Sequence, residues 1–156
     1  MRIKQGKMVV VEDMIIAGIG SRIDTVSFSI VGRPLVQNGM RFARSSQPGG
    51  LPMIYHPKAS DKAKLRAAVE ASLRSVMTTP LPIFQKTALK LDVEFHMNDV
   101  NSRDYDNMTK ILQDSLQGPL LDNDKYIYRS TIAKIPTTFG KSELTLVKII
   151  ATGPAA

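Results

Sequence analysis

The alternating segment Ala88–Met97 places the strongest constraint on how this chain folds. Along an extended backbone its apolar side chains point to one face, and its polar side chains, His96 among them, point to the other. That alternation predicts a β-strand with one buried face, as in a sheet packed against helices. The apolar positions are Leu89, Leu91, Val93, Phe95 and Met97. Further strands are predicted at Val26–Val31, Tyr126–Ile135 and Glu143–Ile150.

Two helices are predicted from apolar residues at helical spacing. The first spans Ser60–Met77, and Ser60 is a suitable N-cap. The second spans Met108–Leu116, with Asp106 or Asn107 as its N-cap and Gly118-Pro119 as its stop. The buried stripe of the second helix should consist of Met108, Ile111, Leu112, Ser115 and Leu116.

The order of these elements, β-α-β-α-β-β, predicts a single α+β domain in which two helices pack on a mixed sheet. We expect the last two strands to form a hairpin through residues 136–140, and residues 151–156 to fray. The glycine- and proline-rich segment 35–57 should be a long loop. Residues 1–24 are assigned to an N-terminal extension, either an edge strand or a loose arm, and residues 25–156 to the domain itself.

Four aspartates and one lysine flank the second predicted helix. Asp104 and Asp106 precede it, Asp122 and Asp124 follow it, and Lys110 lies one turn after Asp106. In the simpler interpretation the first pair caps the helix and the second pair belongs to a turn. In the alternative, the helix and its flanking loops form one acidic pocket that binds Mg²⁺, because gathered carboxylates repel one another unless a cation neutralises them.

The chain carries a formal charge of +7, which favours a polyanionic partner, nucleic acid before an acidic membrane. The excess is concentrated between Arg33 and Arg74, where Asp61 and Glu70 are the only acids. The chain has no cysteine and two histidines, so any metal should be bound by oxygen. No apolar run is long enough for a bilayer and no secretion signal is present, so we expect no membrane partner and an intracellular location.

The predicted loop contains a base-aromatic-base sequence, Arg41-Phe42-Ala43-Arg44. One interpretation is a solvated loop with Phe42 in the core. The other has Arg41 and Arg44 on phosphates while Phe42 stacks on a base or wedges between bases. The segment alone leaves both open.

Several of these motifs together resemble the RusA family of Holliday junction resolvases, which occur in bacteria and their phages. The resemblance is carried by Glu94-Phe95-His96-Met97, Arg103-Asp104-Tyr105-Asp106-Asn107 with Lys110, Asp114, and Leu121-Asp122-Asn123-Asp124. It is strong from about residue 94 to residue 127, and weaker from residue 28 to residue 69.

The resemblance implies a homodimeric endonuclease that binds four-way DNA junctions and makes paired symmetric nicks with Mg²⁺, or with Mn²⁺ in its place. It implies a cytoplasmic or nucleoid location in a bacterium or phage-infected cell. Asp104, Asp106 and Asp124 would be the essential metal-binding carboxylates, with Asp122 as the second choice for the third ligand. Asn107 would support them, and Lys110 would act on the phosphate. Arg33, Arg41, Phe42, Arg44 and Arg103, together with Lys110, would contact DNA.

Three departures from the family pattern keep other functions open. Asn123 stands where relatives often carry an acid, the turn at residues 117–121 is one residue short, and residues 100–102 are less basic. These features favour, as an alternative, a module of the same fold that holds branched DNA but cuts it weakly or not at all. A Mg²⁺-dependent enzyme on small phosphate esters is a third hypothesis, against which the basic first half and the lack of a Gly-rich phosphate loop both count.

Overall fold

The computed structural model describes residues 8–36, 41–43, 53–55, 59–138 and 141–156. Within these residues the chain forms β1 (Val10–Ile19), β2 (Arg22–Val31), β3 (Arg41–Ala43), β4 (Met53–Tyr55), α1 (Ala59–Val76), β5 (Thr87–Met97), α2 (Tyr105–Leu116), the 3-10 helix η1 (Asp124–Tyr126), β6 (Ile127–Pro136) and β7 (Leu144–Pro154). None of the described helices is long and apolar enough to cross a membrane.

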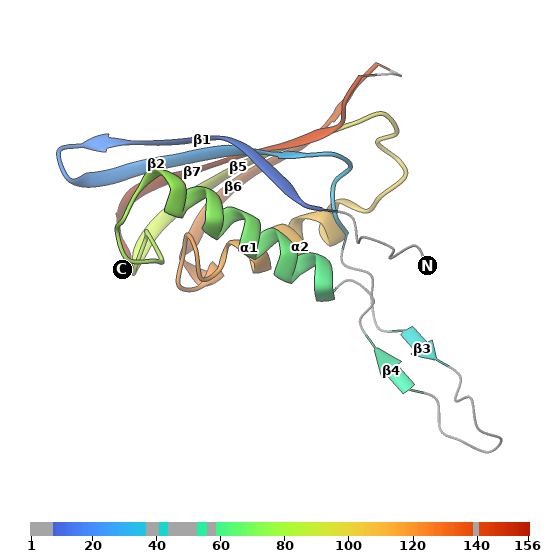
Figure 1. Cartoon of the computed structure of the whole chain (residues 1–156), viewed down its shortest axis with the longest axis horizontal. Helices are drawn as coiled ribbons and strands as arrows, with labels where there is room; N and C mark the ends of the chain where they lie inside the picture. The colour runs from blue at the N-terminus through green and yellow to red at the C-terminus, as the bar shows by residue number, and fades with distance from the viewer. Residues whose placement is uncertain (1–7, 37–40, 44–52, 56–58, 139–140) are drawn as a thin grey trace, which may run out of the picture.

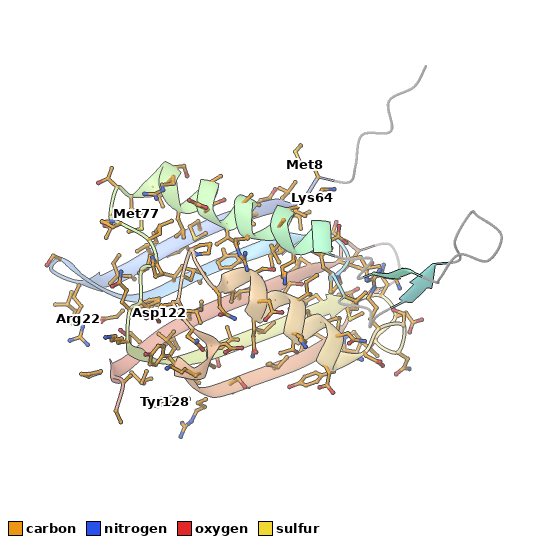
Figure 2. The ribbon with its side chains drawn as sticks, turned by 90° about the horizontal axis from the view of Figure 1, so that it is seen from below. Met8, Arg22, Lys64, Met77, Asp122 and Tyr128 are labelled. Atoms are coloured by element: carbon orange, nitrogen blue, oxygen red, sulfur yellow. The ribbon has the colours of Figure 1, made fainter. Side chains whose placement is uncertain are left out.

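Five of the strands form one mixed sheet in the order β1-β2-β7-β5-β6. β5 runs parallel to β6, whereas the other neighbouring pairs are antiparallel. Both helices cover the same face of this sheet, α1 over the β1–β2 side and α2 over the β5–β6 side (Figures 1 and 2). The predicted class, a single α+β domain with a mixed sheet and two helices, is confirmed.

The predicted hairpin between the last two strands is wrong, because β5 lies between β6 and β7. β5, α2 and β6 instead form a β-α-β unit, in which the helix carries the chain back so that the second strand can run parallel to the first. The predicted fraying after residue 150 is also wrong. β7 continues to Pro154, which pairs with Thr87 at the start of β5.

The core lies between the sheet and the two helices. Every apolar residue predicted on the inner face of β5 is buried, and so is every residue of the predicted α2 stripe. The helices are joined by a hydrogen bond of 2.6 Å from Arg66 Nη2 to the carbonyl of Asp114. The sequence periodicity therefore identified correctly which faces of β5 and α2 are buried.

Two N-terminal segments add structure beyond this core. Val10–Ile19 forms β1, the edge strand that pairs with β2. Within the predicted loop, β3 and β4 form a separate two-stranded ribbon. Figure 1 shows this ribbon apart from the main sheet, beyond the N-terminal end of α1.

Candidate functional site

Asp104 and Asp106 lie at the N-terminal end of α2, and both are exposed. Asp104 is the N-cap residue, rather than Asp106 or Asn107 as predicted, and its backbone is extended (φ −72°, ψ 131°). Its carbonyl accepts a hydrogen bond from Met108 N at 3.1 Å, but its carboxylate makes no capping hydrogen bond. The carboxylate of Asp104 is therefore not used to satisfy the helix end, and it faces solvent.

The loop before Asp104 is held by contacts from two distant parts of the chain. Lys134 Nζ, on β6, donates hydrogen bonds of 2.7 Å to the carbonyls of Val100 and Arg103. Arg33 Nη2, just after β2, donates to Ser102 Oγ at 2.8 Å. Within the loop, Ser102 Oγ donates to the carbonyl of Asp99 at 2.7 Å. These bonds fix the backbone on which Asp104 is mounted.

Lys134 was not identified from the sequence, although a signal was present. In the β5–β6 register it pairs with Phe95, so it lies on the side of the sheet that faces the helices. A lysine at an inward position of a strand must find polar partners, because leaving a charged group buried without hydrogen bonds is costly. Here the two loop carbonyls are those partners.

Asp122 and Asp124 follow α2 and are both exposed. Asp122 Oδ2 accepts a hydrogen bond of 3.3 Å from Lys86 N, at the start of β5. Between them, Asn123 caps η1, and its Oδ1 accepts from Lys125 N at 3.0 Å. The residue that departs from the family pattern thus has a local structural role.

The two aspartate pairs lie at opposite ends of α2. A helix of twelve residues is about 18 Å long. The same separation is visible along β5, because Asp122 is bonded to Lys86 before this strand, whereas Asp104 follows its end. Among the described residues, no three acidic or histidine side chains are grouped closely enough to hold a metal ion. The expectation that one chain folds all four carboxylates into a single pocket is therefore wrong.

Lys110 and Asn107 belong to the Asp104–Asp106 end. Lys110 lies one turn after Asp106 and is exposed, while Asn107 is half-buried. Asp104, Asp106 and Lys110 can therefore serve one ligand at the start of α2.

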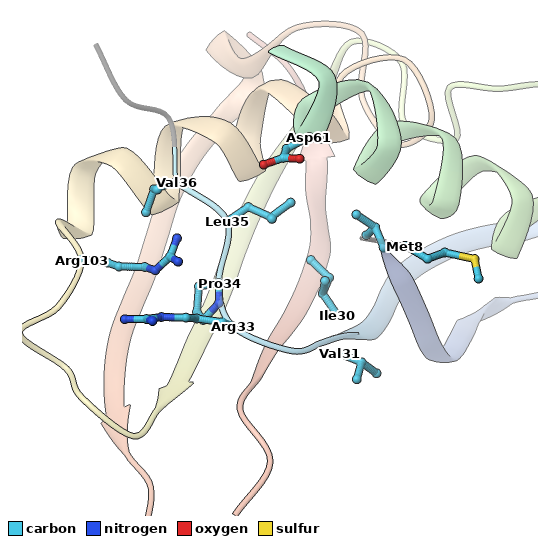
Figure 3. A pocket seen from close by; sticks show the side chains of 10 residues that line it. Met8, Ile30, Val31, Arg33, Pro34, Leu35, Val36, Asp61 and Arg103 are labelled. Atoms are coloured by element: carbon cyan, nitrogen blue, oxygen red, sulfur yellow. The ribbon is translucent and has the colours of Figure 1, made fainter. Parts of the chain in front are cut away.

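A pocket with two guanidinium groups borders this end of α2 (Figure 3). It has a volume of about 200 Å³, and Arg33, Asp61 and Arg103 line it beside apolar residues. Burial, and next the like charge of Arg33, lower the pKa of Arg103, while Glu143 and Asp61 act in the opposite direction. Arg103 Nε is buried and has no hydrogen-bond partner among the described residues. The two neighbouring cations with an unused donor suit an anion such as a phosphate, and the carboxylate of Asp61 offsets part of their charge.

The remaining predicted DNA-binding residues are only partly described. Arg41 and Phe42 lie on β3, whose backbone pairs with Tyr55 and Ile54 of β4, and their side chains are outside the description. Arg44 lies outside the described residues altogether. Their predicted contacts with DNA therefore stay predictions.

Comparison with known protein families matches residues 32–147 to the family described as Endodeoxyribonuclease RusA. The matched span contains α1, β5, α2 and β6, together with both aspartate pairs, Lys110 and the two pocket arginines. A search among curated proteins finds no match.

Proposed function

This chain belongs to the RusA family of Holliday junction endodeoxyribonucleases, and on that premise we propose that it resolves four-way DNA junctions by paired, Mg²⁺-dependent hydrolysis of two phosphodiester bonds. The observation that carries this proposal is the pair of exposed carboxylates, Asp104 and Asp106, at the start of α2. Their loop is anchored, and they lie next to Lys110 and the two pocket arginines.

The donor set at this end of α2 fits Mg²⁺. This ion prefers oxygen ligands, and it is usually held by one or two carboxylates together with substrate phosphates and water. Asp104 and Asp106 would hold it, with Asn107 in support. When bound, the ion would polarise the phosphate and lower the pKa of a coordinated water.

The basic side chains around this site would act directly on the DNA backbone. The ammonium of Lys110 would neutralise charge that develops on the phosphate being cut. Arg33 and Arg103 would grip a neighbouring phosphate and so fix the strand relative to the carboxylates. Arg41, Phe42 and Arg44 would contact the opened junction, where stacking on a base contributes about 1–3 kcal/mol.

A second copy of the chain would complete the carboxylate set. Asp122 and Asp124 are too far from the start of α2 to share a metal with Asp104 and Asp106 of the same chain, since the helix between them is about 18 Å long. In a two-fold homodimer, the Asp122–Asp124 end of one copy would meet the Asp104–Asp106 end of the other. Such an arrangement forms two equivalent sites and explains why paired cuts need a dimer.

The proposal is tested by incubating a labelled mobile four-way junction, beside a linear duplex of the same sequence, with Mg²⁺, Mn²⁺ or EDTA. Metal-dependent, symmetric cuts near the crossover and none on the duplex are expected. Junction binding without cuts in either metal would instead support the non-cutting branched-DNA module. Equal binding to junction and duplex, without cuts, would contradict both.

A further inference from the structure

The outer face of the main sheet, opposite the helices, carries exposed apolar side chains. Both helices lie on the inner face, and no described helix lies on the outer one (Figure 1). Four large apolar residues of β1, β2 and β7 point outward, because each alternates along its strand with a residue that packs on the core: Val10, Ile15, Val31 and Leu146. Their side chains are between 37 % and 61 % exposed. The outer face is therefore an apolar surface without a cover among the described residues.

A groove of about 380 Å³ crosses this face over β1, β2, β7 and β5. Ile15 and Leu146 contribute apolar side chains to its lining. Its charged lining consists of three carboxylates and one ammonium, from Asp13, Asp92, Glu94 and Lys148. The whole chain carries a formal charge of +7, so the groove has the opposite sign to the molecule around it. An apolar floor with an acidic rim is suited to a partner that is both apolar and cationic.

The two carboxylates of β5 can accept further hydrogen bonds. Asp92 Oδ2 lies 3.7 Å from Lys90 Nζ, whereas Asp92 Oδ1 is buried and has no hydrogen-bond partner among the described residues. Glu94 Oε1 lies 3.3 Å from His96 Nε2. An ionised carboxylate accepts from several donors at once, and a buried acceptor without a partner is costly. A cationic side chain placed in the groove would therefore be bound by both carboxylates.

We propose that this groove binds a basic amphipathic helix of another protein. The apolar stripe of that helix packs on Ile15 and Leu146, and its lysine or arginine side chains meet Asp92 and Glu94. A helix is the element that fits, because β2, β7 and β5 already have strands on both sides and offer only side chains to a partner above the sheet. The acidic rim repels DNA and anionic membranes, and a second copy placed face to face would bring like charges together.

The groove is separate from the site at the start of α2. It lies on the outer face of the sheet, whereas α2 lies on the inner face (Figure 1). β1, which contributes Asp13 and Ile15, also precedes residues 32–147, the span that matches the family. The groove is thus built partly by a segment that the family match does not include. A helix bound there would attach a second protein to this chain without occupying the proposed DNA site.

Titration with a synthetic peptide, in the absence of DNA, tests the groove. The probe is a peptide of leucine and lysine about 18 residues long, which is enough for a helix in isolation, with the leucines on one face and the lysines on the other. It should bind the full chain one to one, although both carry positive charge. Changes in amide chemical shift should be confined to the outer face around Ile15, Asp92 and Leu146. The same peptide with glutamate in place of lysine should not bind.

Substitutions on the groove should change the affinity in both directions. Ile15→Ser and the double variant Asp92→Asn/Glu94→Gln should each weaken peptide binding at least about tenfold, as expected for contacts at the centre of an interface. Lys148→Glu should tighten binding, a gain that a misfolded variant would not produce. Val76→Ser is the matched control, because Val76 is 54 % exposed but lies on α1, and it should bind like the wild type.

Four results would overturn the inference: no saturable binding, equal binding of the glutamate peptide, shift changes centred on the start of α2, or no effect of the groove variants. Shift changes on the outer face when the free chain is concentrated would also overturn it, because a second copy would then be the occupant. The endonuclease proposal is judged separately, since Ile15→Ser should cut junctions like the wild type. Peptide binding by a chain that cuts no junction would retain the groove and reject the endonuclease, and cutting without peptide binding would do the reverse.

Discussion

Lys134 and Arg103 are joined by a hydrogen bond of 2.7 Å from the ammonium to the backbone carbonyl, although 31 positions separate them in the sequence. The same ammonium holds the carbonyl of Val100 at 2.7 Å. β6 thereby fixes the residue that immediately precedes Asp104. A lysine outside the family motif thus positions the first carboxylate of the motif.

Replacing Lys134 by methionine should reduce junction cutting about tenfold, the lower end of the effect of residues that orient metal ligands. The loss of two charge-assisted hydrogen bonds should also lower the free energy of unfolding by about 1–3 kcal/mol. The cutting assay should be run at saturating DNA, and the stability measured by urea unfolding. Because a positioned loop holds the metal more tightly, excess Mg²⁺ should partly restore the rate.

Lys148→Met is the matched control, since Lys148 is exposed on β7 and, among the described residues, forms no hydrogen bond or ion pair with the loop before Asp104. It should leave cutting unchanged. If Lys134→Met retained the wild-type rate, or if it lost stability with no change in its Mg²⁺ requirement, Lys134 would have only a structural role.

Asp106→Asn should abolish metal-dependent cutting while junction binding persists. The cutting rate should fall at least about 100-fold, because replacing a residue that only supports a metal ligand can already lower activity by that factor. Asp106 is exposed in the first turn of α2, so an asparagine side chain at this position should not disturb the fold. Asp24→Asn makes the same chemical change at the far end of the sheet and should retain full activity. Wild-type cutting by Asp106→Asn in Mg²⁺ would remove this residue from the site.

The elements that could be predicted from sequence are those whose periodicity is local. The inner face of β5 and the stripe of α2 each follow from side chains a few residues apart, and all of them are buried. Long-range pairing has no such signal. The seven residues, 136–142, between the predicted final strands suggested a hairpin, whereas the sheet inserts β5 between β6 and β7. The helix between them carries the chain back over the inner face of β5, so β6 is added beside β5 in a β-α-β unit rather than beside β7.

The candidate site likewise has a local part that the sequence predicted and a long-range part that it did not. The motif predicted Asp104, Asp106 and Lys110 at the start of a helix, where the structure has them, while their joint role in a metal site stays a prediction. It also predicted that Asp122 and Asp124 would join them, because both pairs are close in sequence. The length of α2 and the parallel course of β6 keep the pairs apart within one chain. Residues that are close in sequence but lie on either side of a straight helix are therefore held at its two ends and should not be expected to bind one metal ion together.

Arg33→Gln should weaken junction binding but change stability little, because the lost hydrogen bond to Ser102 is opposed by relief of the like charge beside Arg103. The like charge of Arg33 is one cause of the lowered pKa of Arg103, so the pair is held together at an electrostatic cost that a bound phosphate offsets. Removing one phosphate contact should reduce the slope of log affinity against log salt concentration by about 0.9. Binding isotherms at several salt concentrations and thermal unfolding measure the two effects.

Arg22→Gln is the control for this substitution, because Arg22 is exposed, paired with Asp24 at 3.2 Å, and at the end of the sheet opposite to the start of α2. It should change neither the salt slope nor the selectivity for junctions. Unchanged junction affinity in Arg33→Gln, or an equal loss in Arg22→Gln, would show that the Arg33–Arg103 pocket does not contact DNA.

Mixing two inactive double variants should restore cutting if each metal site combines carboxylates from two chains. Asp104→Asn/Asp106→Asn and Asp122→Asn/Asp124→Asn should each be inactive alone. In a mixed dimer, one site would receive all four substituted residues, and the other would be wild type throughout. After free exchange of equal amounts, about a quarter of all sites should be intact. Each mixed dimer should nick one strand, so the product should be a nicked junction rather than two resolved duplexes.

A mixture of Asp104→Asn with Asp106→Asn is the control, because no combination of these chains restores a complete pair, and it should stay inactive. If the double-variant mixture stayed inactive although subunit exchange was verified, the sites would not be shared between chains. If Asp122→Asn/Asp124→Asn were active by itself, the second pair would not bind the metal at all.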